Sequence, residues 1–123
     1  MHITTATSAR HAIISTLNRS AFGGDAEAEL IGQLRDRGLA LVERMALDAG
    51  EIVGHILFSR LDVECEAQPV RAAALAPMAV RPDRQREGIG SSFVRDGLTA
   101  LRSQGCEAVY VGAASSWSPI TKL

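Results

Sequence analysis

The sequence predicts a mixed α/β domain of the α+β type, in which helices flank a mainly antiparallel sheet. The chain has 123 residues, of which 46% are hydrophobic and 22% charged, as in one domain with a packed core. Apolar residues recur every three or four positions in the first third and then form short continuous runs. A final apolar run follows a helical segment, and a helical crossover places the strand after it parallel to the strand before it.

Two helices are predicted near the start, after a short strand over residues 2–5. The first covers residues 8–22, with Ser8 as its N-cap, and a glycine pair ends it. The second covers residues 25–37, with Asp25 as its N-cap and two glutamates near the positive end of its dipole.

Three strands follow in the middle of the chain. Apolar runs over 39–47 and 52–61 flank Asp48-Ala49-Gly50-Glu51, whose composition fits a tight hairpin turn. The polar stretch 62–69 is predicted to be a loop, and an alanine-rich strand covers 71–80.

The last third predicts a helix and a closing strand. Pro82 prevents the ladder of the third strand from continuing. Apolar residues at helical spacing predict a helix from residue 89 to about 104, which Gly105 ends. Residues 108–111 form a short apolar strand, which the crossover makes parallel to the strand over 71–80.

The segment 75–95, LAPMAVRPDRQREGIGSSFVR, combines a strand, an arginine-rich turn, two glycines and a helix start. Gly88 and Gly90 let a backbone approach a ligand, and the first turn of a helix offers unpaired N–H groups, so a pyrophosphate fits there. Phe93 excludes a dinucleotide fingerprint, and Ser91-Ser92 excludes a Walker A loop. The alternative is a flexible helix entry. Four arginines are expected to surround the site with positive charge: Arg81, Arg84, Arg86 and Arg95.

The run Gln85-Arg86-Glu87-Gly88-Ile89-Gly90 resembles the pyrophosphate loop of the GNAT superfamily of acyl-CoA-dependent N-acetyltransferases. The preceding segment 75–82 looks like the fourth strand of that family, and the likeness covers residues 2–112. The resemblance implies a GNAT-like acetyl-CoA-binding domain over residues 1–112, followed by an atypical tail over 113–123.

The resemblance also implies a role for each matching residue. Backbone groups of Met78, Ala79 and Val80 would pair with the pantetheine arm, and the Val80 N–H would point at the thioester oxygen. An amine acceptor would attack the acetyl-CoA thioester directly, so catalysis would rest mostly on positioning. The amides that would hold the pyrophosphate belong to Gln85, Arg86, Glu87, Gly88, Ile89, Gly90 and Ser91.

Side chains outside this segment give further candidates. His55 is a general-base candidate because its ordinary pKa of about 6.5 lies near the operating pH, and a structural histidine in a strand is the alternative. Glu64 and Glu66 are candidates for attracting a cationic amine, with a solvated loop as the alternative. No metal site is predicted, since His2 and His11 lack spaced partners.

Composition and the C-terminus bound the function further. The net charge of −1 excludes general attraction to nucleic acid, and no apolar run is long enough to span a membrane, so the cytoplasm is the predicted location. Beyond Val111 the sequence resembles none of the family's ending, which predicts a C-terminally truncated fold with an open edge at 108–111. Either this strand or the tail is expected to pair with another subunit in a homodimer. Trp117 is expected to be a buried anchor. A non-catalytic CoA-binding or regulatory module and a dimerising remnant are the alternatives to an enzyme; the acceptor amine and the general acid stay open.

Overall fold

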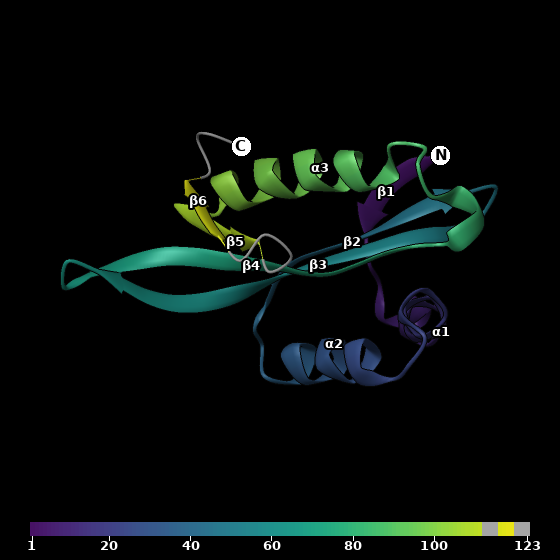
Figure 1. Cartoon of the computed structure of the whole chain (residues 1–123), viewed down its shortest axis with the longest axis horizontal. Helices are drawn as coiled ribbons and strands as arrows, with labels where there is room; N and C mark the ends of the chain where they lie inside the picture. The colour runs from purple at the N-terminus through teal and green to yellow at the C-terminus, as the bar shows by residue number, and fades with distance from the viewer. Residues whose placement is uncertain (112–115, 120–123) are drawn as a thin grey trace.

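The computed structural model describes residues 1–111 and 116–119, with side chains as far as Tyr110 except those of Cys65 and Ala76. Within these residues one sheet, in the strand order β1-β2-β3-β4-β5-β6, lies between two helical layers. Helix α3 covers one face of the sheet, and α1 and α2 cover the other (Figure 1). This arrangement confirms the predicted fold class. The elements are β1 (His2–Thr5), η1 (Ser8–Arg10), α1 (His11–Phe22), α2 (Ala26–Asp36), β2 (Ala40–Asp48), β3 (Glu51–Cys65), β4 (Gln68–Val80), η2 (Pro82–Arg84), α3 (Ile89–Ser103), β5 (Ala108–Val111) and β6 (Ser116–Pro119).

Strands β1 to β4 pair antiparallel in chain order, and β5 pairs parallel with β4. The parallel pair runs from Ala72 opposite Ala108 to Leu75 opposite Val111. This is the pair that the helical crossover predicted, because α3 carries the chain back to the edge of β4.

Both hairpins end in two-residue turns with left-handed backbone. Ala49 and Gly50 have φ of 52° and 81°, which confirms the predicted tight turn. The loop predicted over 62–69 is wrong. Strand β3 continues to Cys65, β4 begins at Gln68, and Glu66 and Ala67 form the turn with φ of 53° and 62°. Without a glycine or asparagine, this turn has no sequence signal. The hairpin projects beyond the rest of the sheet (Figure 1).

The two predicted N-caps do not cap. Ser8 lies inside the short 3₁₀ turn η1, and α1 begins at His11. Asp25 is the N-cap residue of α2, but its carboxylate accepts a hydrogen bond from Arg19 Nε at 2.8 Å instead of one from the helix backbone. The ion pair between α1 and α2 thus replaces the cap.

Apolar side chains pack on both faces of the sheet. On the α3 face, Phe93 and Leu101 of the helix pack with Ile56 and Phe58 of β3. On the other face, Ile14 of α1 packs with sheet residues that include Ala79. Burial of a large apolar side chain stabilises a fold by about 1.5–3 kcal/mol, so both helical layers are held by these contacts.

The open edge predicted for 108–111 is wrong, because β6 covers it. Strand β6 pairs antiparallel with all of β5, from Ala108 opposite Pro119 to Val111 opposite Ser116. The Trp117 side chain, predicted as an anchor, lies outside the described residues. Among the helices of the described part, none is long and apolar enough to cross a membrane.

Candidate functional site

Strand β4 is interrupted by a bulge before residues 78–80. Ile56 lies opposite Met78 and Phe58 opposite Leu75, so Ala76 and Pro77 together face one residue of β3. Proline has no N–H to donate to a ladder, which explains its place in the bulge. The pairing with β5 ends at Leu75, so no described strand pairs with the outer edge of residues 78–80. On that edge the Val80 carbonyl accepts a hydrogen bond from Gln85 Nε2 at 3.1 Å.

The backbone of Met78 and Val80 points to this unpaired edge. The N–H of Arg81 donates to the carbonyl of Val53 at 2.8 Å, which makes Val80 and Gly54 a non-hydrogen-bonded pair of the antiparallel ladder. The N–H and C=O of Val80 therefore point away from β3, and alternation gives Met78 the same direction. Ala79, between them, pairs with His55.

The loop before α3 holds a row of backbone donors. Among the described residues, no backbone N–H from Gln85 to Ser91 donates to another backbone group, whereas the N–H of Ser92 donates to the carbonyl of Gly88. Gly88 is the N-cap residue with φ of 85°, and no side chain caps the helix. The first turn of α3 contains no acidic residue, so the positive end of its dipole is not neutralised there.

Residues of this loop, with the exception of Glu87, line a cavity of about 260 Å³. Val80 lies at one side of it, next to the free edge of β4, and the loop and the first turn of α3 form the rest. The end of β4 and the loop that follows it in the chain thus also lie together around this cavity. The residues that line the cavity are Val80, Arg84, Gln85, Arg86, Gly88, Ile89, Gly90 and Ser91.

Carboxylates neutralise part of the predicted positive charge. Arg84 donates to Asp48 at 2.6 Å and to Glu87 at 2.9 Å, and these contacts raise its pKa. Arg81 is held by Asp83 and Glu51 in the same way.

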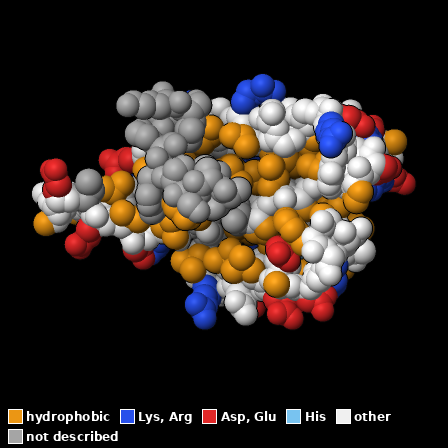
Figure 2. Space-filling model, viewed as in Figure 1, with side chains coloured by type: hydrophobic (Ala, Val, Ile, Leu, Met, Phe, Trp, Pro, Cys, Tyr) orange, Lys and Arg blue, Asp and Glu red, His pale blue; other side chains and the backbone are white. Residues whose placement is uncertain are grey.

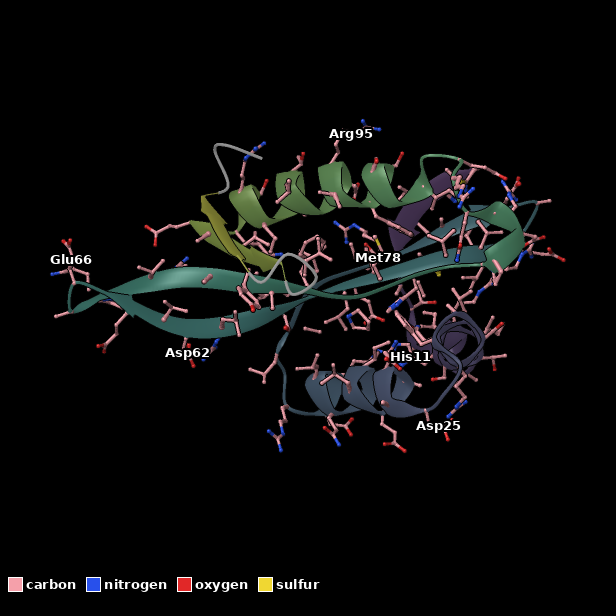
Figure 3. The ribbon with its side chains drawn as sticks, in the orientation of Figure 1. His11, Asp25, Asp62, Glu66, Met78 and Arg95 are labelled. Carbon is pink, nitrogen blue, oxygen red and sulfur yellow. The ribbon has the colours of Figure 1, made fainter. Side chains whose placement is uncertain are left out.

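Arg95 lies on the outer side of α3 and points away from the sheet (Figure 3). The prediction of four arginines around the site is thus wrong for Arg81 and Arg95, which do not line the cavity. Arg86 is exposed and lines it, and no ion pair or hydrogen bond of its side chain is found within the described residues. Its backbone has φ of 66°, in the left-handed region.

His55 lies on the α1–α2 face of the sheet and its side chain is 0% exposed. Its Nε2 donates to Glu43 Oε2 at 2.7 Å, and its Nδ1 accepts from the Asn18 side-chain nitrogen at 3.4 Å. Glu43 also accepts two hydrogen bonds from Arg35, with Nε at 3.0 Å and Nη2 at 2.5 Å. The general-base role stays a prediction, and these contacts are those of the structural alternative.

Burial would raise the pKa of Glu43, but hydrogen bonds from His55 and Arg35, together with the charge of Arg35, lower it to about 2. The pKa of the nearby His11 is lowered by burial and by the charge of Arg35. Glu43, Asn18 and Arg35 were not among the candidates predicted from the sequence. The available signal was the pair Glu43-Arg44 inside an apolar strand run, since a charged side chain on a covered face of a sheet requires a partner.

The remaining candidates lie away from the cavity. Glu66 is at the tip of the β3–β4 hairpin, at the opposite end of the molecule from the start of α3 (Figure 3). Hydrophobic side chains are visible on the surface between the α3 layer and the α1–α2 layer (Figure 2). The described surface on this face is thus mainly apolar between the two helical layers.

A family model for the acetyltransferase (GNAT) family matches residues 11–118. The uncharacterized N-acetyltransferase YjhQ of Escherichia coli K12 is 34% identical over 108 residues, which are 86% of this chain and 60% of that protein. The uncharacterized N-acetyltransferase YhbS of the same organism is 34% identical over 97 residues, or 78% of this chain and 57% of that protein. The chain thus spans about 60% of the length of these curated relatives.

Two solved structures share the fold over 89% of this chain at 30% identity. One is a GNAT family acetyltransferase from Brucella melitensis in complex with acetyl-CoA, with a TM-score of 0.81 and 73% of that chain covered. The other is YhbS from Escherichia coli in complex with CoA, with a TM-score of 0.82 and 61% of that chain covered.

Proposed function

Because the chain belongs to the acetyltransferase (GNAT) family, we propose that it binds acetyl-CoA and transfers the acetyl group to an amine acceptor. The acetyl-CoA and CoA complexes of the two similar structures support this co-substrate. The residues proposed to bind it are those at the free edge of β4 and in the loop before α3.

The observation that carries the proposal is the row of unpaired amides from Gln85 to Ser91 around the cavity. An uncapped helix start with unpaired N–H groups binds anions well, since the donors and the helix dipole both favour negative charge. The carboxylates that hold Arg84 leave these amides as the main binding groups for a pyrophosphate, with the exposed Arg86 beside them.

The pantetheine arm of the co-substrate would extend from the loop along the free edge of β4. Its amide groups would pair with Met78 and Val80, whose backbone groups point to that edge. The Val80 N–H would donate to the thioester oxygen, where negative charge develops as the amine attacks the carbonyl carbon. The C–N bond forms, the C–S bond breaks, CoA leaves as the thiolate, and the amine loses a proton. Positioning supplies most of the rate, and no covalent enzyme intermediate is needed.

Calorimetric titration with acetyl-CoA tests the binding step. We expect Gly88→Arg to abolish binding, because Gly88 has left-handed backbone with φ of 85°, and a side chain at this position strains the loop that carries the donors. The added arginine is positively charged and would attract the anionic pyrophosphate. Electrostatic repulsion therefore cannot explain a loss of acetyl-CoA binding in this variant. Gly23→Arg is the matched control, because Gly23 also has left-handed backbone with φ of 75°, its added Cβ has no atom within 4 Å, and it lies between α1 and α2, away from the loop. Equal binding by the two variants would contradict the proposed site.

Acetyl-CoA consumption with a panel of amines separates an enzyme from a non-catalytic CoA-binding module. The module is the second candidate, because the cavity and the edge of β4 supply groups for a co-substrate and do not identify a residue that would bind an amine. Intact binding without turnover of any amine would support the module.

Cytoplasmic location and a homodimer are further parts of the proposal. Because β6 already covers β5, a dimer contact through this edge would have to use β6. Light scattering at micromolar concentration tests for the dimer, and a monomer mass would refute it.

A further inference from the structure

We propose that His55 is a positioning residue for acetyl transfer. Its hydrogen bonds to Glu43 and Asn18 fix the β3 backbone opposite Ala79, and so direct the N–H of Val80 at the thioester carbonyl. The inference rests on the proposed function and adds a role for a buried cluster on the far face of the sheet from the loop.

The backbone of His55 is one of two attachments to β3 that flank Val80, the other being the bond from Arg81 to Val53. The bulge at Ala76 and Pro77 interrupts the ladder on one side. On the other side, the bond from Arg81 to Val53 is the last one before Pro82, which has no N–H to donate. Between these points the Ala79–His55 pair connects β4 to β3, since the pairs at Met78 and Val80 are of the non-hydrogen-bonded kind. Any shift of His55 would therefore turn the Val80 N–H.

Three neighbouring elements hold the His55 ring in place. Asn18 belongs to α1, Glu43 to β2, and the Arg35 that clamps Glu43 belongs to α2. Glu43 lies diagonally across from His55 on the same face of the sheet, since its direct partner is Leu57. With a hydrogen bond at each ring nitrogen and no exposed surface, the ring has one orientation.

Gly54, the residue before His55, contacts α3 on the opposite face of the sheet. A Cβ added at Gly54 would lie 2.8 Å from Phe93 Cε2 and 3.3 Å from Ile89 Cγ2, so the start of α3 rests directly on this glycine. The same helix start carries the amides of the proposed pyrophosphate site. Residues 54 and 55 thus fix both ends of the site, the helix start through Gly54 and the Val80 N–H through His55.

Asn18 lowers the stability of the core, because one of its polar atoms is buried without a hydrogen-bond partner among the described residues. This atom is Oδ1, and an unpaired buried acceptor destabilises a fold. Its side-chain nitrogen donates to Ile14 O at 3.0 Å and contacts His55. A polar group kept in the core at a cost to stability is typical of a functional position.

The test measures the thioester carbonyl directly. Acetyl-CoA labelled with ¹³C at the carbonyl is bound to the wild type, His55→Leu, Glu43→Gln and the control Arg19→Ala, which removes an exposed ion pair between α1 and α2. The ¹³C chemical shift reports polarisation by the Val80 N–H. Calorimetry gives the affinities for acetyl-CoA and for CoA, which lacks the carbonyl.

We expect both cluster variants to bind CoA within about twofold of the wild type. Their preference for acetyl-CoA over CoA should fall about three- to tenfold, the value of one hydrogen bond, and the ¹³C resonance should move toward that of free acetyl-CoA. Arg19→Ala should change neither quantity. Glu43→Gln nearly preserves the side-chain shape, so it keeps the test decisive if His55→Leu does not fold.

Two results would overturn the inference. Cluster variants with the wild-type ¹³C shift and wild-type preference would show that His55 only fills the core, with the proposed function intact. A wild type that binds neither CoA nor acetyl-CoA would instead refute the proposed function, and with it the positioning role.

Discussion

The contact between Gly97 of α3 and Phe58 of β3 decides how closely the helix approaches the sheet. A Cβ added at Gly97 would lie 2.1 Å from Cε2, 2.5 Å from Cζ and 3.1 Å from Cδ2 of the Phe58 ring. Carbon atoms in contact lie about 3.5–4.0 Å apart, so the helix or the ring would have to move by about 1.5 Å. Phe58 is 0% exposed, and its ring has no free space to enter.

We therefore expect Gly97→Ala to destabilise the protein, although alanine favours helices. The helix propensity of alanine adds about 1 kcal/mol relative to glycine. Overpacking costs about 1–3 kcal/mol, and the rigid buried ring places this site at the upper end. The net loss is about 2 kcal/mol in the free energy of unfolding, or about 8 °C in Tm for a domain of this size.

Urea and thermal unfolding, followed by circular dichroism, measure the effect. Gly32→Ala in α2 is the matched control, because its added Cβ has no atom within 4 Å, and it should stabilise the protein by up to about 1 kcal/mol. Phe58→Leu should cost less in the Gly97→Ala variant than in the wild type, a coupling that a double-mutant cycle detects. A Gly97→Ala protein at least as stable as the wild type would refute the reasoning.

Three further substitutions test the electrostatics and the turns. Hydrogen bonds lower the Glu43 pKa from its ordinary 4.5 to about 2, so Glu43 stabilises the fold above its ordinary pKa by about 3 kcal/mol. That stability is lost as the pH falls through this window. The free energy of unfolding of Glu43→Gln, measured in urea, should therefore depend less on pH between 4.5 and about 2 than that of the wild type. An equal pH dependence in the two proteins would disprove this. Hydrogen bonds from Arg84 and its charge lower the Asp48 pKa, so Arg84→Ala should raise it in a ¹³C NMR titration, whereas an unchanged value would exclude the ion pair. Ala49→Asn should stabilise the fold by up to about 1 kcal/mol and so raise Tm, because Ala49 has φ of 52° and asparagine tolerates that backbone. A lower Tm would count against this.

The order and type of the helices and strands as far as β5 could be predicted from the sequence, whereas β6 was not predicted. The parallel pair of β4 and β5 followed from a helix between two apolar runs, and the Ala49-Gly50 turn from its composition. The β3–β4 turn at Glu66 and Ala67 could not be predicted, because neither residue favours a positive φ. Its left-handed backbone is imposed by the pairing of the two strands.

The candidate cavity was also predictable in part. Apart from Glu87, the loop residues from Gln85 to Ser91 line one cavity because they are neighbours in the chain. The charge around the cavity was not predictable. Arg81 and Arg84 look like free cations in the sequence, but Asp48 and Glu51 reach them from the β2–β3 hairpin.

The sequence alone determined the family, the order of helices and strands as far as β5, and the loop with its glycines, because each depends on residues close together in the chain. Only the tertiary structure decided which side chains meet across elements. Asn18, Arg35, Glu43 and His55 come from four separate elements and form one buried cluster. No local pattern encodes such a cluster, since its hydrogen bonds form only when both helices pack on the sheet.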